Sequence, residues 1–87
     1  MKTSRCKHSN NGFFDGPLIL KPEIFKDPRG SFLESWNLDR FNNLLNTKTC
    51  FVQDNQSISA KGVLRGMHYQ IPPFDQGKLV RCTSGSV

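Results

Sequence analysis

Long apolar runs, paired cysteines and clusters of one charge sign are all scarce in this 87-residue chain. The longest clean apolar stretch near its start, residues 18–20, is far too short for a signal-peptide core or a membrane span. The three cysteines lie far apart and form no Cys-x-x-Cys pair, which argues against both a disulfide framework and a zinc site. We therefore expect reduced thiols and a cytoplasmic protein.

The net charge of +5 comes from basic residues that are spread along the chain, with no run of five or more. The only cluster, Lys2, Arg5 and Lys7, lies in a polar stretch without an apolar repeat. This pattern favours a solvated tail over a nucleic-acid-binding arm. We expect neither a nucleic-acid nor a membrane partner, whereas a small anionic ligand such as a phosphate ester is compatible with the charge.

The organisation predicted along the chain is one flexible segment followed by one domain. Residues 1–15 are polar and rich in Asn, Gly and Ser, without periodicity, so we expect them to be flexible. Residues 16–87 alternate short apolar pieces with turn signals, which is typical of a small β-rich domain.

Several short strands and one helix are predicted within this domain. The expected strands cover residues 18–20, 24–25, 32–36, 49–57, 63–70 and 78–83. Asp, Pro and Gly in residues 27–30 occupy positions that a type I turn prefers. A helix is expected after the cap residue Asn37, because Phe41, Leu44 and Leu45 recur at helical spacing. The pattern predicts an all-β sandwich or barrel with one short helix.

The last two expected strands would form a hairpin that brings a histidine near a lysine. If Gln70 pairs with Gln76 across the loop, the antiparallel register places His68 opposite Lys78 on one face. A neighbouring ammonium favours the neutral imidazole that a general base needs, and it can stabilise an enolate oxygen. The pattern therefore indicates proton abstraction next to a carbonyl, although a single histidine on a half-buried strand is more often structural.

The sequence allows two interpretations of Arg65. Strict alternation places it on the face opposite His68, where it would be a salt-bridged surface residue. A bulge at Gly66 would shift the alternation and place both side chains on the same face. The two interpretations are equally open.

Four motifs, in this order and spacing, resemble those of dTDP-4-dehydrorhamnose 3,5-epimerases. They are DxRGxFxE at 27–34, FVQDNQS at 51–57, GVLRGMHYQ at 62–70 and QGKLVR at 76–81. The resemblance covers about residues 16–87 and implies a partial cupin-type jelly roll, the N-terminal part of a truncated epimerase domain. It also implies a cofactor-free and metal-free isomerase, usually a homodimer, that converts dTDP-4-dehydro-6-deoxy-glucose to dTDP-4-dehydro-rhamnose in dTDP-rhamnose biosynthesis.

The resemblance also implies catalytic roles. His68 would be the proton acceptor at C5 and C3, and Lys78 would stabilise charge at the C4 oxygen. The family's general-acid tyrosine, the carboxylate that orients the histidine and a further substrate-contacting histidine follow the matched segment, beyond the last residue here. Tyr69 is the only tyrosine and belongs to the base motif. Epimerisation returns a proton to the opposite face, so we expect an inactive fragment, poorly folded because of its unpaired strand edges.

Substrate-binding roles are implied for five further residues. Arg65 would hold the diphosphate, while Gln53 and Asn55 would contact the nucleotide. Arg29 and Glu34 would also bind the nucleotide, in the family across the dimer interface. An arginine fork suits phosphate oxygens and a carboxylate suits the N–H of a base, so these residue types fit such roles.

Three alternative interpretations stay open. A metal-dependent cupin, such as a dioxygenase, needs several ligands, whereas the motif around His68 offers one histidine. A non-catalytic cupin module would bind a dTDP-sugar without turnover. A related epimerase would act at one carbon only or on another dTDP-keto sugar.

Overall fold

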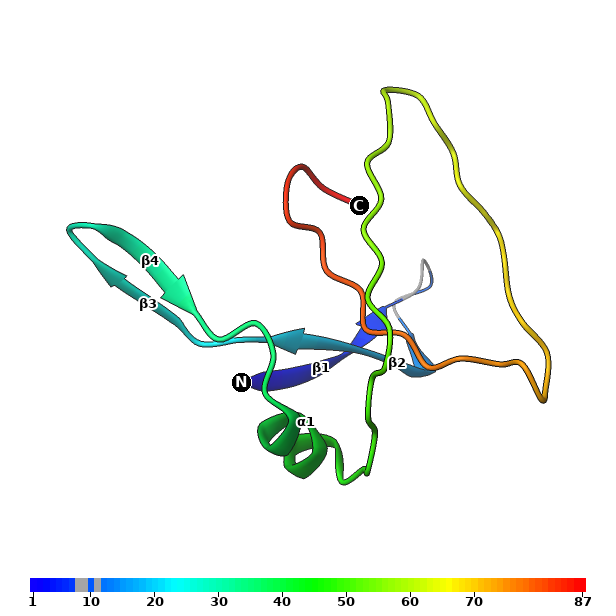
Figure 1. Cartoon of the computed structure of the whole chain (residues 1–87), viewed down its shortest axis with the longest axis horizontal. Helices are drawn as coiled ribbons and strands as arrows, with labels where there is room; N and C mark the ends of the chain where they lie inside the picture. The colour runs from blue at the N-terminus through cyan, green and yellow to red at the C-terminus, as the bar shows by residue number, and fades with distance from the viewer. Residues whose placement is uncertain (8–9, 11) are drawn as a thin grey trace. The chain divides into compact units, whose positions relative to one another are not determined.

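The computed structural model describes residues 1–7, 10 and 12–87, and within them it contains four strands and one helix (Figure 1). The chain divides into two units, Met1–Asp54 and Asn55–Val87, which are described separately. The elements are β1 (Lys2–Lys7), β2 (Phe13–Lys21), β3 (Ile24–Asp27), β4 (Gly30–Leu33) and α1 (Leu38–Leu45). Both sheets are two-stranded and antiparallel, so the prediction of an all-β fold with one short helix is confirmed.

The first sheet pairs β1 with β2. Lys2 lies opposite Lys21, and the register shifts after Arg5 so that Lys7 lies opposite Phe13. The Arg5 guanidinium and the Lys7 ammonium lie 5.4 Å and 5.9 Å from the centroid of the Phe13 ring, within cation–π range. The basic cluster therefore belongs to a paired strand.

No strand was predicted in residues 1–15, whereas the structure has β1 and the start of β2 there. Polar composition hides this pairing, because it depends on backbone groups, which need partners whatever the side chain is. Residues 8, 9 and 11 of the segment lie outside the described residues. The flexibility of the segment stays a prediction.

The second sheet is a tight hairpin of β3 and β4. Ile24 pairs with Leu33 at its open end, and Asp27 pairs with Gly30 at the loop. Gly30 has a φ of +135°, a backbone conformation that residues with a Cβ rarely adopt. The predicted turn at residues 27–30 is confirmed, whereas the strand expected at 32–36 ends at Leu33.

Helix α1 begins and ends with asparagine caps. The side-chain Oδ1 of Asn37 accepts a hydrogen bond from the Arg40 N–H at 3.0 Å. Asn46 closes the helix in the left-handed conformation, with a φ of 50°, which asparagine tolerates better than most residues. The predicted cap and helix are confirmed.

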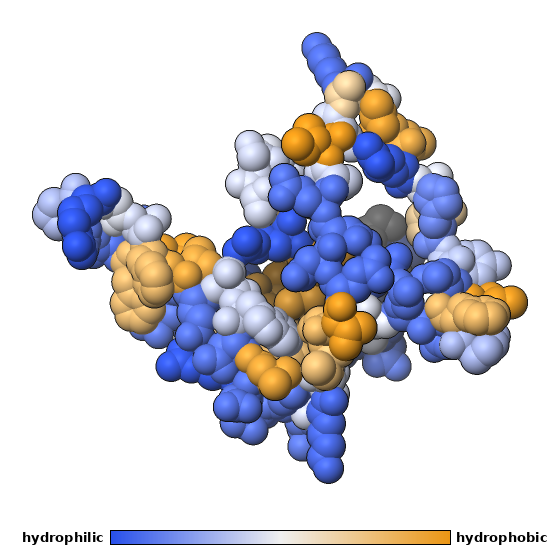
Figure 2. All heavy atoms as spheres, in the orientation of Figure 1, coloured by the Kyte–Doolittle hydropathy of each residue, from blue (hydrophilic) through white to orange (hydrophobic). Residues whose placement is uncertain are grey.

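Three aromatic rings form the core of the first unit. The ring centroid of Trp36 lies 4.9 Å from that of Phe41 and 5.3 Å from that of Phe51, and the last two are 5.7 Å apart. We call these three residues the aromatic trio. Phe41 is the only buried hydrophobic residue among those described. Figure 2 shows many other hydrophobic side chains on the surface of the face it draws.

The second unit has two turns but no helix or strand among its residues, all of which are described. The Val63 N–H binds the carbonyl oxygen of Ala60 at 3.2 Å, and the Phe74 N–H binds that of Ile71 at 2.9 Å. The strands predicted at 49–57, 63–70 and 78–83 are absent.

The predicted hairpin that would place His68 opposite Lys78 is therefore not formed. A strand becomes stable when burial of one face offsets the entropy lost on ordering the backbone. In this unit every residue is exposed, and the side chains of Leu64 and Met67 exceed 90% exposure. Nothing in the unit compensates the cost of ordering an isolated hairpin.

Candidate functional site

The seven residues predicted to form the site divide between the two units. Those in the unit Met1–Asp54 are Arg29, Glu34 and Gln53. Those in the unit Asn55–Val87 are Asn55, Arg65, His68 and Lys78.

Arg29 lies in the loop of the β3–β4 hairpin and is bound by Asp27. One carboxylate oxygen, Oδ1, accepts from the Arg29 backbone N–H at 2.8 Å. The other, Oδ2, accepts from Nε at 3.1 Å and from Nη2 at 2.5 Å. The bond from the Arg29 side chain, and then that from its backbone N–H, hold the pKa of the Asp27 carboxyl below its ordinary value. The same bond raises the pKa of the Arg29 guanidinium.

Glu34 lies just after β4 and links the hairpin to the start of α1. Its Oε2 accepts from Nδ2 of Asn37 at 3.4 Å, and its Oε1 lies 3.5 Å from Nη1 of Arg40. Because the Glu34 side chain is still 39% exposed, the ion pair is weak and the carboxylate can exchange partners. Arg29 and Glu34 therefore contact different protein partners.

Arg65 is held at one end by the segment that precedes it. Its Nε donates to Oγ of Ser59 at 2.8 Å, and its Nη2 donates to the carbonyl oxygen of Ile58 at 3.3 Å. The guanidinium has five N–H donors, so three stay available for an anionic ligand. Arg65 is exposed, as a phosphate-binding side chain must be before its ligand arrives.

His68 and Lys78 are both exposed, and among the described residues neither side chain forms a hydrogen bond or an ion pair. Gln53 and Asn55 flank the boundary of the two units, and each is exposed while making an interaction with the protein. The structure therefore gives Arg29, Glu34 and Arg65 defined partners, whereas His68 and Lys78 have none among the described residues.

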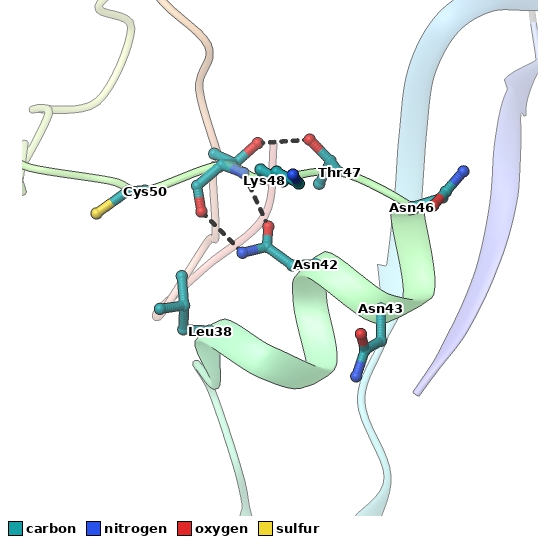
Figure 3. A pocket seen from close by; sticks show the side chains of 8 residues that line it. Leu38, Asn42, Asn43, Asn46, Thr47, Lys48 and Cys50 are labelled. Carbon is teal, nitrogen blue, oxygen red and sulfur yellow. Dashed lines mark hydrogen bonds between the residues drawn. The ribbon is translucent and has the colours of Figure 1, made fainter.

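An open hollow of about 610 Å³ lies beside the C-terminal end of α1. Figure 3 shows Asn42 pointing from the helix toward the segment that follows it. The Asn42 Nδ2 donates to the backbone oxygen of Thr49, and its Oδ1 accepts from the Thr49 N–H, each at 3.0 Å. The Thr47 and Thr49 hydroxyls are 3.0 Å apart and share a hydrogen bond. None of the seven predicted site residues lines this hollow, which is formed by Asn and Thr side chains together with Leu38, Lys48 and Cys50.

Metal-ligand side chains do not gather in groups of three or more anywhere in residues 1–7, 10 and 12–87. In the same residues, no helix is both long and apolar enough to cross a membrane.

Sequence reasoning missed three residues that hold others in place, namely Asp27, Asn42 and Ser59. An Asp two positions before an Arg is a visible signal, because a tight turn brings such side chains together. The contacts from Asn42 to Thr49 and from Arg65 to Ser59 span seven and six positions of the chain. No sequence periodicity marks either of them.

Comparisons with known proteins give one consistent answer. A family model described as dTDP-4-dehydrorhamnose 3,5-epimerase matches residues 13–87. The dTDP-4-dehydrorhamnose 3,5-epimerases of Shigella flexneri and Salmonella typhimurium are 56% and 54% identical over 70 residues, which cover 80% of this chain. A dTDP-4-dehydrorhamnose 3-epimerase of Streptomyces niveus is 38% identical over 73 residues, covering 84% of this chain.

The matched parts are 39%, 38% and 35% of these three relatives, so the chain spans about two fifths of the length of the curated relatives it matches. No solved structure matches the chain.

Proposed function

Because this chain belongs to the dTDP-4-dehydrorhamnose 3,5-epimerase family, we propose that it supplies part of an isomerase acting on dTDP-4-dehydro-6-deoxy-glucose. The resemblance found in the four motifs is confirmed by this membership. The all-β class with one short helix agrees with the cupin-type jelly roll of the family. The observation that carries the proposal is that the match over residues 13–87 contains every one of these motifs.

The proposed reaction is a proton transfer at the two carbons next to the 4-keto group. The imidazole of His68 takes the proton from C5 or C3, and the electron pair of the broken C–H bond moves into an enolate. The ammonium of Lys78 stabilises the negative charge on the C4 oxygen. A proton donated to the opposite face by the general-acid tyrosine that the family resemblance implies, outside the residues matched here, restores the ketone and inverts the carbon. Atoms and electrons balance without an oxidant, so the step requires no redox cofactor.

Substrate binding is proposed for the remaining five residues. Arg65 binds the diphosphate with the three N–H donors that Ser59 and Ile58 leave available, which supports an arginine fork on phosphate oxygens. Arg29 binds the nucleotide from the hairpin loop. The other three proposed nucleotide contacts are Glu34, Gln53 and Asn55.

A single-carbon epimerase is the second candidate. The relative from Streptomyces niveus is named a 3-epimerase and is similar to 84% of this chain. The same base and the same lysine would then act at C3 alone. The two candidate reactions differ in whether the proton at C5 is exchanged in addition to the proton at C3.

We also propose a cytoplasmic location and a homodimeric whole protein. Three free cysteines, Cys6, Cys50 and Cys82, support a reducing compartment. Support for the dimer comes from the usual state of the family.

The activity is tested with a chimera, because the chain spans about two fifths of its relatives. Residues 13–87 replace the matching segment of the Shigella flexneri relative, and proton exchange at C3 and C5 is followed by NMR in deuterium oxide. We expect deuterium at both carbons. His68→Ala should lower the exchange rate about a thousandfold, and Lys78→Met about a hundredfold.

The matched control is Lys61→Met, which removes an exposed lysine in a turn of the same unit. Full exchange in the His68→Ala chimera would rule out this residue as the base. Deuterium at C3 alone would identify the single-carbon reaction instead.

A further inference from the structure

The carboxylate of Asp27 occupies one particular edge of the Arg29 guanidinium. A guanidinium can present a pair of parallel N–H donors along its Nε/Nη2 edge or at its Nη1/Nη2 end. Oδ2 of Asp27 accepts from both members of the first pair, at 3.1 Å and 2.5 Å. Nη1 and the second N–H of Nη2, which form the other end, are bound by no side chain or backbone group among the described residues.

Asp27 also ties this guanidinium to the backbone. Its second oxygen accepts from the Arg29 N–H at 2.8 Å, so one carboxylate bridges the main chain and the side-chain head of the same residue. Asp27 is itself part of the β3–β4 hairpin, which is paired at four positions, from Ile24 opposite Leu33 to Asp27 opposite Gly30. The loop thus holds the guanidinium in one orientation.

The free end of the guanidinium faces solvent, since the Arg29 side chain is 91% exposed. An exposed ion pair between residues two apart contributes little to folding stability, typically about 0 to 1 kcal/mol. What this pair fixes is the direction of the remaining donors. An arginine that is ordered before its ligand arrives loses less conformational entropy on binding.

We propose that Asp27 is a positioning residue: by holding the Nε/Nη2 edge of Arg29, it directs the Nη1/Nη2 end toward two acceptor oxygens of a nucleoside diphosphate. The inference rests on the proposed function, in which Arg29 binds the nucleotide. The two acceptor oxygens could belong to the diphosphate or to the base, because both carry oxygens that accept hydrogen bonds from such a fork. Inorganic pyrophosphate and thymidine, used as separate probes, distinguish the two sources.

The charge of Asp27 and its orienting role have opposite effects on the affinity for a diphosphate, so a mutation of Asp27 can distinguish them. Asp27 carries a negative charge next to Arg29 and lowers the positive potential that an anionic ligand meets. Removal of this charge should therefore strengthen diphosphate binding if Asp27 has no orienting role. If Asp27 positions Arg29, the same change should weaken binding.

The experiment follows the Nε–H signal of Arg29 by NMR in the 87-residue chain during titration with dTDP. We expect this signal to shift on binding, and Asp27→Asn to raise the Kd about tenfold. Asp75→Asn is the matched control, because it makes the same change in net charge at an exposed residue of the other unit. It should leave the Kd within about twofold.

Asp27→Asn could also loosen the hairpin, and the cross-strand contacts between Phe25 and Phe32 report whether it does. A second variant tests the inference independently of such loosening. Arg29→Lys keeps the charge but has no fork, and it should weaken dTDP binding to a similar degree. Unchanged or tighter binding by either variant overturns the inference. A wild-type chain that binds dTDP without a shift at Arg29 overturns it as well. If no signal of the wild-type chain responds to dTDP, the proposed nucleotide binding itself fails.

Discussion

Asn42 binds both backbone groups of Thr49 through one side-chain amide, with two hydrogen bonds of 3.0 Å. The amide thereby pairs with the backbone N–H and C=O of Thr49, as a neighbouring strand would do in a sheet. It fixes the chain that leaves α1, and Phe51 follows two residues later to complete the aromatic trio. The segment that carries Gln53 and Asn55 thus starts from an anchored point.

Loss of the Asn42 amide should release this segment. Asn42→Ala leaves the N–H and the carbonyl of Thr49 without their partner, so the first unit should lose about 1 to 2 kcal/mol of stability. Asn42→Asp retains an acceptor but cannot donate to the Thr49 oxygen, and it should be nearly as harmful. Faster amide exchange at Thr49 measures the effect. Asn43→Ala, an exposed position on the same helix, is the control, and an equal effect there would contradict this role for Asn42.

The helix caps should respond in opposite directions. Asn37→Ala removes the acceptor for the Arg40 N–H and should cost about 1 kcal/mol, which Asn37→Ser should largely restore. Asn46→Gly should be neutral or slightly stabilising, because glycine adopts a φ of 50° without the steric cost of a side chain. Helix content from circular dichroism ranks these variants. An Asn46→Gly chain with clearly less helix would contradict the capping argument.

The aromatic trio should dominate the stability of the first unit. Phe41 is only 6% exposed, so Phe41→Ala removes about 3 kcal/mol of packing, enough to unfold a core of three rings. Phe74→Ala provides the control, since the same side chain is 72% exposed there. Thermal melting of α1 compares the two variants. Similar melting temperatures would show that the trio is not the core.

The Asp27 carboxyl should titrate below its ordinary pKa of 3.8. The group is ionised more readily in the folded hairpin than in the unfolded chain. Its contribution to hairpin stability is therefore complete above the unfolded pKa and is lost as the pH falls through the lower folded pKa. Carbon-detected NMR of the Asp27 carboxyl gives the midpoint. Arg29→Ala should raise that midpoint toward 3.8, and identical midpoints in the two chains would contradict the pairing.

The sequence predicts local structure well where that structure depends on residues a few positions apart along the chain. The turn at residues 27–30 and the cap at Asn37 are set by contacts two or three positions apart. The partner of a strand lies farther along the chain, and composition does not reveal it. β1 was therefore missed, although it is paired with β2 along most of its length.

The candidate site shows the same division. Motif resemblance selected Arg29, Glu34 and Arg65, for which the structure provides defined partners. Alternation of side chains around His68 and Lys78 does not order a strand by itself, because a strand also requires its apolar face to be covered. Their catalytic roles stay predictions, because they rest on resemblance to the family.

Trp36 is the only tryptophan of the chain, and its ring touches both other members of the trio. Its fluorescence is consequently a built-in optical reporter for the first unit alone. Because Trp36 is 40% exposed even in the folded unit, its emission should be only slightly blue-shifted, and it should move further to the red when the contacts with Phe41 and Phe51 are lost. The state of α1 can thus be read in a cuvette, without a label, during any ligand titration or mutational series.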